Sequence, residues 1–130
     1  MFNKAVMVVD NDADALEDLA TMLKRQGLVV LKVHDAASAL HLVRSLTPDL
    51  FLLNMWTPGL DGSDLCRRLR ANQHTAKTPV IIFSASNTPH ARQDALASGA
   101  DLFLPKEDGP NELLRAVQTL IARNGHTPTL

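Results

Sequence analysis

The side chains best suited to chemistry follow directly after short apolar runs of the chain. The acidic turn Asp10–Asp12 follows the run Ala5–Val9, and Asn54 follows the run Leu50–Leu53. Carboxylates bind hard cations and act as nucleophiles, whereas the neutral amide of Asn54 is not a competent attacker on phosphorus. The sequence therefore indicates a polar site in which only some positions carry a charge.

Two further reactive groups, the Ser84 hydroxyl and the Lys106 amine, follow later apolar runs. The sequence has no Cys–His pair, no Ser–His–Asp order and no zinc-ligand spacing, so it does not predict an enzyme. Cys66 lies in an expected helix and is interpreted as a packing residue. The histidines are scattered without ligand spacing, which favours surface or structural roles for His34, His41, His74, His90 and His126.

Five short aliphatic runs alternate with longer segments of helical period. Runs that are apolar throughout are typical of strands covered on both faces. The alternation predicts five βα units with right-handed crossovers around a parallel sheet, which is a doubly wound α/β fold. The expected strands are Ala5–Val9, Leu28–Val33, Leu50–Leu53, Pro79–Phe83 and Asp101–Leu104, and the expected helices include Leu16–Leu23, Ala36–Leu46, Ser63–Arg70, Pro89–Ser98 and Leu113–Ile121.

Local signals mark where the expected helices begin and end. Proline suits a first helical turn at positions 89 and 110, and glycine suits a helix end at positions 27 and 99. We predict one domain over residues 1–123, followed by a flexible tail or linker over 124–130. The predicted N-caps are Asp12, Asp35, Asp61 and Thr88.

The composition fits a globular protein and excludes several functional classes. The chain is 45% hydrophobic and 21% charged, with a formal net charge of −1, so no general affinity for nucleic acid is expected. The basic cluster Arg67, Arg68 and Arg70 has helical spacing and is interpreted as a solvated face. No apolar run is long enough for a signal peptide or a bilayer span. With a single cysteine, we expect a cytoplasmic protein without membrane contact.

Four motifs in the same order and spacing resemble the response regulator receiver domains of two-component phosphorelay signalling, the CheY-like family. The resemblance extends from Lys4 to about Arg123. It implies a flavodoxin-like three-layer (βα)5 sandwich with strand order 2-1-3-4-5. The motifs are VVDND at Val8–Asp12, PDLFLLNMWTPGLDG at Pro48–Gly62, FSAS at Phe83–Ser86 and GADLFLPK at Gly99–Lys106.

The resemblance also implies a role for each site residue. Asn54 occupies the position of the phosphoacceptor aspartate, and Ser84 and Lys106 are its expected partners on the phosphoryl group. Phe103 occupies the position of an aromatic that rotates between exposed and buried states, although a static, half-buried residue fits equally well. The implied Mg²⁺ ligands are Asp10, Asn11, Asn54 and the backbone carbonyl of Trp56, whose indole is expected to lie over the pocket.

The chain departs from the family where the chemistry would occur. Amides at Asn11 and Asn54 replace two of three expected carboxylates, leaving Asp10. A unit-charge pair at about 4 Å attracts with roughly 4 kcal/mol at an effective dielectric of 20, and a divalent ion doubles this value per carboxylate. We therefore expect no bound Mg²⁺, a pocket that hydrogen-bonds internally, and an ion pair between Lys106 and Asp10. Asp12 is expected to cap the first helix rather than bind metal.

Two smaller departures accompany these amides. Thr57 stands where the family usually has methionine, and Glu107 rather than proline follows Lys106, so no cis peptide is expected there. Because several positions differ together, we favour natural degeneracy of the site over an engineered change at Asn54.

The sequence thus predicts a degenerate receiver, or pseudo-receiver, that acts by protein–protein interaction without phosphorylation. The expected partner is a sensor histidine kinase, an output domain or another receiver, including a homodimer. Contact is expected through the fourth helix, fifth strand and fifth helix, with Ala91, Ala95, Leu104 and Leu114 on that surface.

Two alternatives remain open from the sequence. In the first, the chain is an active phosphoacceptor that uses Asp10 or Asp12, or whose Asn54 is an engineered substitution, and Mg²⁺ binding survives. In the second, the chain is a flavodoxin-like cofactor binder. The acidic turn after the first strand would repel a phosphate there, which disfavours the second alternative.

Overall fold

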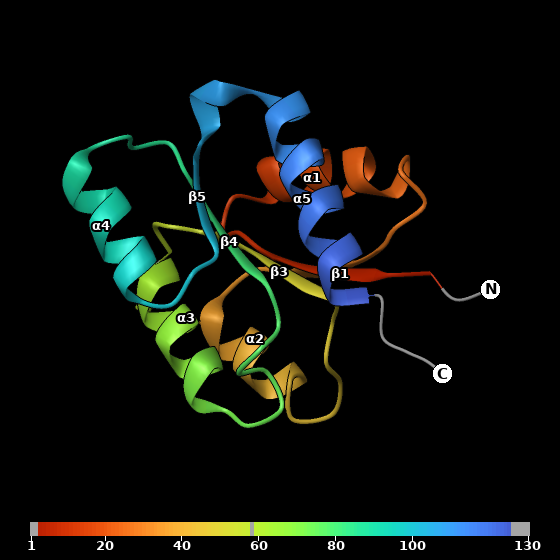
Figure 1. The fold of residues 1–130 in the computed structure, drawn as a ribbon, viewed down its shortest axis with the longest axis horizontal. Helices are drawn as coiled ribbons and strands as arrows, with labels where there is room; N and C mark the ends of the chain where they lie inside the picture. The colour runs from red at the N-terminus through yellow and green to blue at the C-terminus, as the bar shows by residue number, and fades with distance from the viewer. Residues whose placement is uncertain (1–2, 58, 126–130) are drawn as a thin grey trace.

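The computed structural model describes residues 3–57 and 59–125, which form a parallel five-stranded sheet between two layers of helices (Figure 1). The strand order is β2-β1-β3-β4-β5, so the doubly wound, flavodoxin-like architecture is confirmed. The strands are β1 (Ala5–Val9), β2 (Val29–Val33), β3 (Leu50–Asn54), β4 (Val80–Ser84) and β5 (Leu102–Pro105).

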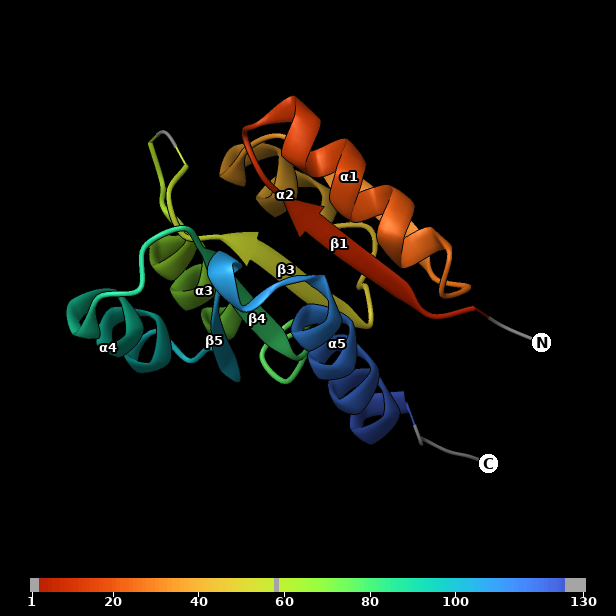
Figure 2. The ribbon, with the colours of Figure 1, turned by 90° about the horizontal axis from the view of Figure 1, so that it is seen from above.

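Helices cover both faces of the sheet, and Figure 2 shows the two layers from above. Alternate residues of each strand point to opposite faces, so β1 buries Val6 and Val8 with α1 and α5, and Met7 and Val9 with α2, α3 and α4. The helices are α1 (Ala13–Lys24), α2 (Ala36–Leu42), α3 (Gly62–Ala71), α4 (Pro89–Ala97) and α5 (Pro110–Gly125), with a short 3-10 turn, η1 (Lys106–Asp108), before α5.

The predicted helix signals are confirmed. Each capping side chain accepts a hydrogen bond from a backbone N–H of the first turn, which satisfies donors that have no partner within the helix. Gly27 and Gly99 adopt positive φ values of 83° and 104°, a region that favours glycine. The four capping residues are Asp12, Asp35, Asp61 and Thr88.

Several predicted boundaries differ from the structure. The last two expected strands are shifted by one residue toward the C-terminus, β2 begins one residue later and β3 ends one residue later than predicted. Helix α2 ends at Leu42 rather than near Leu46. The second strand is not covered on both faces, because it lies at the sheet edge and Val29 is 44% exposed. Helix α5 continues to Gly125, two residues into the predicted tail, and residues 126–130 of that tail lie outside the described residues.

The prediction that the arginine cluster of α3 forms a solvated face is wrong for Arg70. Its guanidinium donates to the backbone carbonyls of Gly99, Thr75, Ala76 and Thr78, at 2.6–3.3 Å, and pairs with Asp101 at 3.0 Å. Arginine presents five N–H donors in a planar fork, which suits it to several acceptors at once. This one side chain therefore joins the loop before β4 to the turn before β5.

No helix among the described residues is long and apolar enough to cross a membrane.

Cys66 is buried against the sheet, as predicted for a packing residue. Burial raises the pKa of its thiol, so the reactive thiolate form is disfavoured at neutral pH.

Candidate functional site

The candidate site forms at the carboxyl ends of four neighbouring strands of the sheet. In the parallel register, Val9 lies beside Leu53, and Asn54 lies beside Phe83. Ser84 pairs with Pro105, the residue before Lys106. The topology therefore brings Asp10, Asn54, Ser84 and Lys106 to one edge, as the sequence predicts.

The amide of Asn54 is the centre of this site. Its nitrogen donates to the Trp56 carbonyl at 2.9 Å, and lies 3.3 Å from Asp10 Oδ1 and 3.5 Å from Asn11 Oδ1. An amide has two N–H donors, and the contact to the Trp56 carbonyl is the shortest of the three. The predicted internal hydrogen bonding of the pocket is confirmed.

Asp10 is the buried charge of the site, with 1% of its surface exposed. Its Oδ1 accepts from the Asp12 N–H at 3.0 Å as well as from Asn54. Its Oδ2 has no hydrogen-bond partner among the described residues and lies 3.6 Å from the Lys106 ammonium. The predicted pair is thus confirmed as an ion pair that is longer than a hydrogen bond.

Lys106 also contacts an aromatic ring that the sequence did not assign to the site. Its ammonium lies 5.4 Å from the centre of the Phe83 ring, within the range of a cation–π interaction. Phe83 is the residue before Ser84 and packs with α1 and α5 on the opposite side from α4. The ring therefore helps to direct the lysine toward Asp10.

The remaining residues of the first loop have structural partners. Asp12 accepts from the N–H groups of Asp14 and Ala15 at 3.0 and 3.2 Å, which confirms it as the N-cap of α1. Asn11 is exposed, and its side-chain oxygen faces the Asn54 amide. The turn therefore places the buried Asp10 carboxylate and the Asn11 amide at the site, whereas the Asp12 carboxylate caps α1.

The loop after β3 is held close to the strand by a glycine that the sequence analysis did not single out for this reason. A Cβ at Gly62 would lie 2.6 Å from the Asn54 carbonyl oxygen, so only glycine allows α3 to start this close to the site. Trp56 is 53% exposed, and its backbone carbonyl accepts from the Asn54 amide. The Thr57 hydroxyl donates to the Leu60 carbonyl at 2.5 Å, which braces the loop from within.

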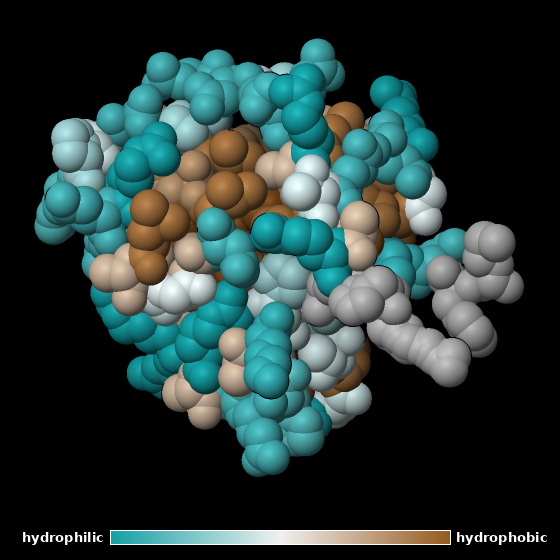
Figure 3. Space-filling view, viewed as in Figure 1, coloured by the Kyte–Doolittle hydropathy of each residue, from teal (hydrophilic) through white to brown (hydrophobic). Residues whose placement is uncertain are grey.

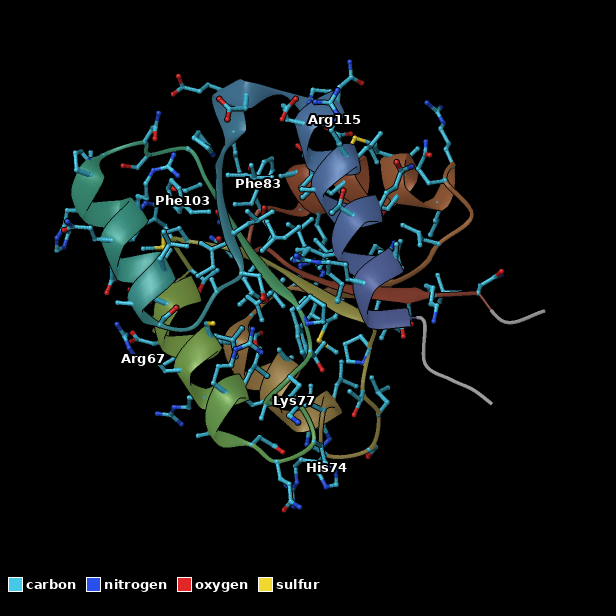
Figure 4. The ribbon with its side chains drawn as sticks, viewed as in Figure 1. Arg67, His74, Lys77, Phe83, Phe103 and Arg115 are labelled. Carbon is cyan, nitrogen blue, oxygen red and sulfur yellow. The ribbon has the colours of Figure 1, made fainter. Side chains whose placement is uncertain are left out.

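Ser84 and Phe103 are both buried. The Ser84 oxygen accepts from the Ser86 N–H at 3.0 Å, so the hydroxyl shapes the loop before α4. Phe103, labelled in Figure 4, is 3% exposed rather than half-buried. The Arg92 guanidinium of α4 lies 5.0 Å from its ring centre. Arg92 could not be predicted at this position, because no local signal in the sequence connects an arginine of one helix to an aromatic ring on the following strand.

These residues do not fit a divalent metal ion. Mg²⁺ requires near-octahedral oxygen ligands, whereas here an amide nitrogen with its hydrogens lies among the oxygens of Asp10, Asn11 and Trp56. Among the described residues that meet at the Asn54 amide, Asp10 supplies the one carboxylate, and Lys106 already offsets its charge. The described residues contain no group of three or more His, Cys, Asp or Glu side chains placed to hold a metal.

Replacing Lys106 with methionine is expected to destabilise the fold by about 1–2 kcal/mol. The substitution leaves the buried Asp10 carboxylate without its counterion, and the partial exposure of Lys106 reduces the effect below that of a fully buried pair. Urea unfolding would measure the loss. In the double variant D10N/K106M the loss is expected to be smaller than the sum of the single losses, and strict additivity would contradict the pairing.

Comparison with known proteins supports the assignment suggested by this geometry. Residues 6–118 match the family described as the response regulator receiver domain. The chain is 36% identical over 123 residues to the DNA-binding response regulator MtrA of Mycolicibacterium paratuberculosis, covering 95% of this chain and 53% of that protein. It is 30% identical over 125 residues to the phosphate regulon transcriptional regulatory protein PhoB of Pseudomonas aeruginosa, covering 96% and 55%. The chain spans about half the length of these curated relatives.

Solved structures share the fold closely. The receiver domain of a Francisella response regulator superposes with a TM-score of 0.85 at 30% identity, covering 93% of this chain and 98% of that one. The receiver domain of a sensor histidine kinase from Pseudomonas aeruginosa PAO1, with a magnesium ion coordinated in its active site cleft, gives 0.86 at 25% identity, covering 93% and 99%. Sequence motifs, sheet order and site geometry lead to the same conclusion: the chain belongs to the response regulator receiver domain family.

Proposed function

We propose that this chain is a receiver module of two-component signalling that works without phosphorylation and without Mg²⁺. The Asn54 amide carries the proposal. Its nitrogen contacts the oxygens of Asp10, Asn11 and Trp56, which are the groups that the family resemblance assigns to the metal. An amide at this position supplies hydrogen bonds where the metal would supply charge, and it offers no nucleophile for phosphoryl transfer.

The alternative acceptors are poorly placed for phosphoryl transfer. Asp10 is buried and its two oxygens face Asn54, the Asp12 N–H and Lys106. The Asp12 carboxylate already accepts hydrogen bonds from the first turn of α1. A phosphoryl group on either carboxylate would displace these contacts, which favours the inert module over a site with a substitute acceptor.

An inert receiver transmits information through its surface, and we propose a protein partner of the two-component system. A sensor histidine kinase, an output domain or another receiver fits this role. The curated relatives that the chain matches include a DNA-binding response regulator about twice its length. By analogy, a receiver of this kind acts on a separate output domain.

We propose the surface of α4, β5 and α5 as the contact region, including contact with a second copy. Figure 3 shows an apolar area over β5 between these helices. Two predicted contact residues are wrong, because Ala91 and Ala95 are 2% and 0% exposed and pack against the sheet. The side chains available there are Leu96, which is 44% exposed, and the half-buried Leu102, Leu104 and Leu114.

A titration with Mg²⁺ followed by beryllofluoride tests the proposal. Trp56 is the single tryptophan, and its carbonyl contacts the Asn54 amide, so its fluorescence reports on the site. We expect no saturable change in fluorescence and no rise in the melting temperature at millimolar Mg²⁺. Saturable quenching, or a melting temperature that rises with Mg²⁺, would show a working metal site and refute the inert module.

A further inference from the structure

One hollow formed by the described residues lies at the amino ends of the strands, opposite the candidate site. It has a volume of about 600 Å³ and lies between the loop before β3 and the loop before β4. A second hollow of about 210 Å³ adjoins it and shares Thr47 and His74. Figure 4 places His74 and Lys77 at the end of the molecule away from Phe83 and Arg115.

The side chains around these two hollows carry an excess of positive charge. Lys77 and His74 line the larger hollow, and Arg44 and His74 line the smaller one. None of the three forms an ion pair within the described part of the chain. The acidic residue of the lining, Asp49, already accepts a hydrogen bond from the Ala5 N–H at 2.7 Å.

In the loop that supplies His74 and Lys77, three backbone carbonyl groups are already bound to Arg70 and would not face an anion in the hollow. The carbonyls of Thr75, Ala76 and Thr78 all accept from the Arg70 guanidinium. The residues that line the larger hollow include several with side-chain donors, namely Thr47, Gln73, Lys77 and Thr78.

We propose that the paired hollows bind a phosphorylated small molecule of nucleotide size. Cations and hydroxyl or amide donors are the groups that recognise phosphate oxygens. Lys77 lines the larger hollow, Arg44 the smaller one, and His74 both. The larger volume falls in the range of about 300–1,000 Å³ that is usual for small-molecule sites. Leu46, 36% exposed, lines the smaller hollow and offers an apolar contact for the unphosphorylated part.

The test uses ADP, pyrophosphate and adenosine as probes in buffer without divalent cations. Amide chemical shifts locate the bound probe, and calorimetry measures its affinity. The double variant R44Q/K77Q removes the Arg44 and Lys77 cations, while K24Q removes one cation from α1, outside the hollows, and serves as a control. Because the buffer contains no metal, the outcome is independent of the proposed loss of phosphoryl transfer at Asn54.

We expect ADP and pyrophosphate to bind saturably, with shifts centred on residues 44–47 and 73–78, and adenosine to bind far more weakly. R44Q/K77Q should weaken ADP binding by at least about tenfold, and K24Q should leave it unchanged. Equal loss of affinity in K24Q, shifts confined to the edge that holds Asn54, or the absence of saturable ADP binding would overturn the proposal.

Discussion

The double variant N11D/N54D is expected to take up one phosphoryl group from acetyl phosphate in the presence of Mg²⁺, whereas the native chain takes up none. The substitution at 54 replaces an amide with a carboxylate nucleophile that can form an acyl phosphate. The substitution at 11 places a further carboxylate next to residue 54, because the Asn11 side-chain oxygen lies 3.5 Å from the Asn54 nitrogen. Intact mass spectrometry measures the added group directly.

The two substitutions are expected to act together because a divalent cation must offset the new negative charge. Each carboxylate within about 4 Å of Mg²⁺ contributes a gross attraction of roughly 8 kcal/mol at an effective dielectric of 20. Without metal, a carboxylate at 54 would instead face Asp10, whose Oδ1 lies 3.3 Å from the present amide nitrogen.

The single variants separate these contributions. N54D alone should be less stable than the native chain in metal-free buffer and should be phosphorylated less than the double variant. N11D alone should take up no phosphoryl group, because it restores a metal ligand but no nucleophile at 54. Phosphorylation of the native chain or of N11D would show that another carboxylate serves as acceptor, and would contradict the role assigned to Asn54.

Replacing Arg70 with alanine is expected to lower the free energy of unfolding by about 2–4 kcal/mol, one of the largest losses available outside the apolar core. The guanidinium donates to four backbone carbonyls and pairs with Asp101. Its removal leaves these acceptors dependent on water at the start of β4 and β5. For a domain of this length, the melting temperature should fall by roughly 10 °C, measured by thermal or urea unfolding.

Two neighbouring substitutions control this prediction. R68A removes an exposed arginine from the same helix that has no hydrogen bond or ion pair with the described residues, and should change stability by less than about 0.5 kcal/mol. R70K keeps the charge near Asp101 but loses the fork that reaches several carbonyls, so it should lose more stability than R68A and less than R70A. Equal losses for R68A and R70A would mean that the carbonyl contacts contribute little.

The positions of the site residues could be predicted from the sequence because chain direction determines them. In a parallel sheet every strand runs the same way, so residues that follow apolar runs gather at one edge. This reasoning placed Asp10, Asn54, Ser84 and Lys106 together, and the order of β1 and β3 came from the family resemblance. The capped helix starts were equally predictable, since capping depends on residues close in sequence.

The contacts that cross the fold could not be read in the same way. Arg70 has the spacing of a surface residue, yet its guanidinium reaches the turn before β5. Arg92 lies over Phe103, and Ala91 and Ala95 face the sheet rather than solvent. The rotation of a helix about its axis and the reach of a long side chain depend on which elements pack together, and local periodicity is weak in α4.

The sequence by itself determined the doubly wound class and the capped helix starts. Through the family resemblance, it also predicts that two amides stand where carboxylates would support metal and phosphate. Only the tertiary structure decided that the Asn54 nitrogen lies among three oxygens, that Lys106 stands 3.6 Å from Asp10, and that Arg70 holds two distant loops. The physical reason is the distance along the chain over which each kind of interaction acts. Capping and strand patterning act over a few residues of chain, whereas hydrogen bonds and ion pairs between loops exist only after the sheet has brought their strands side by side.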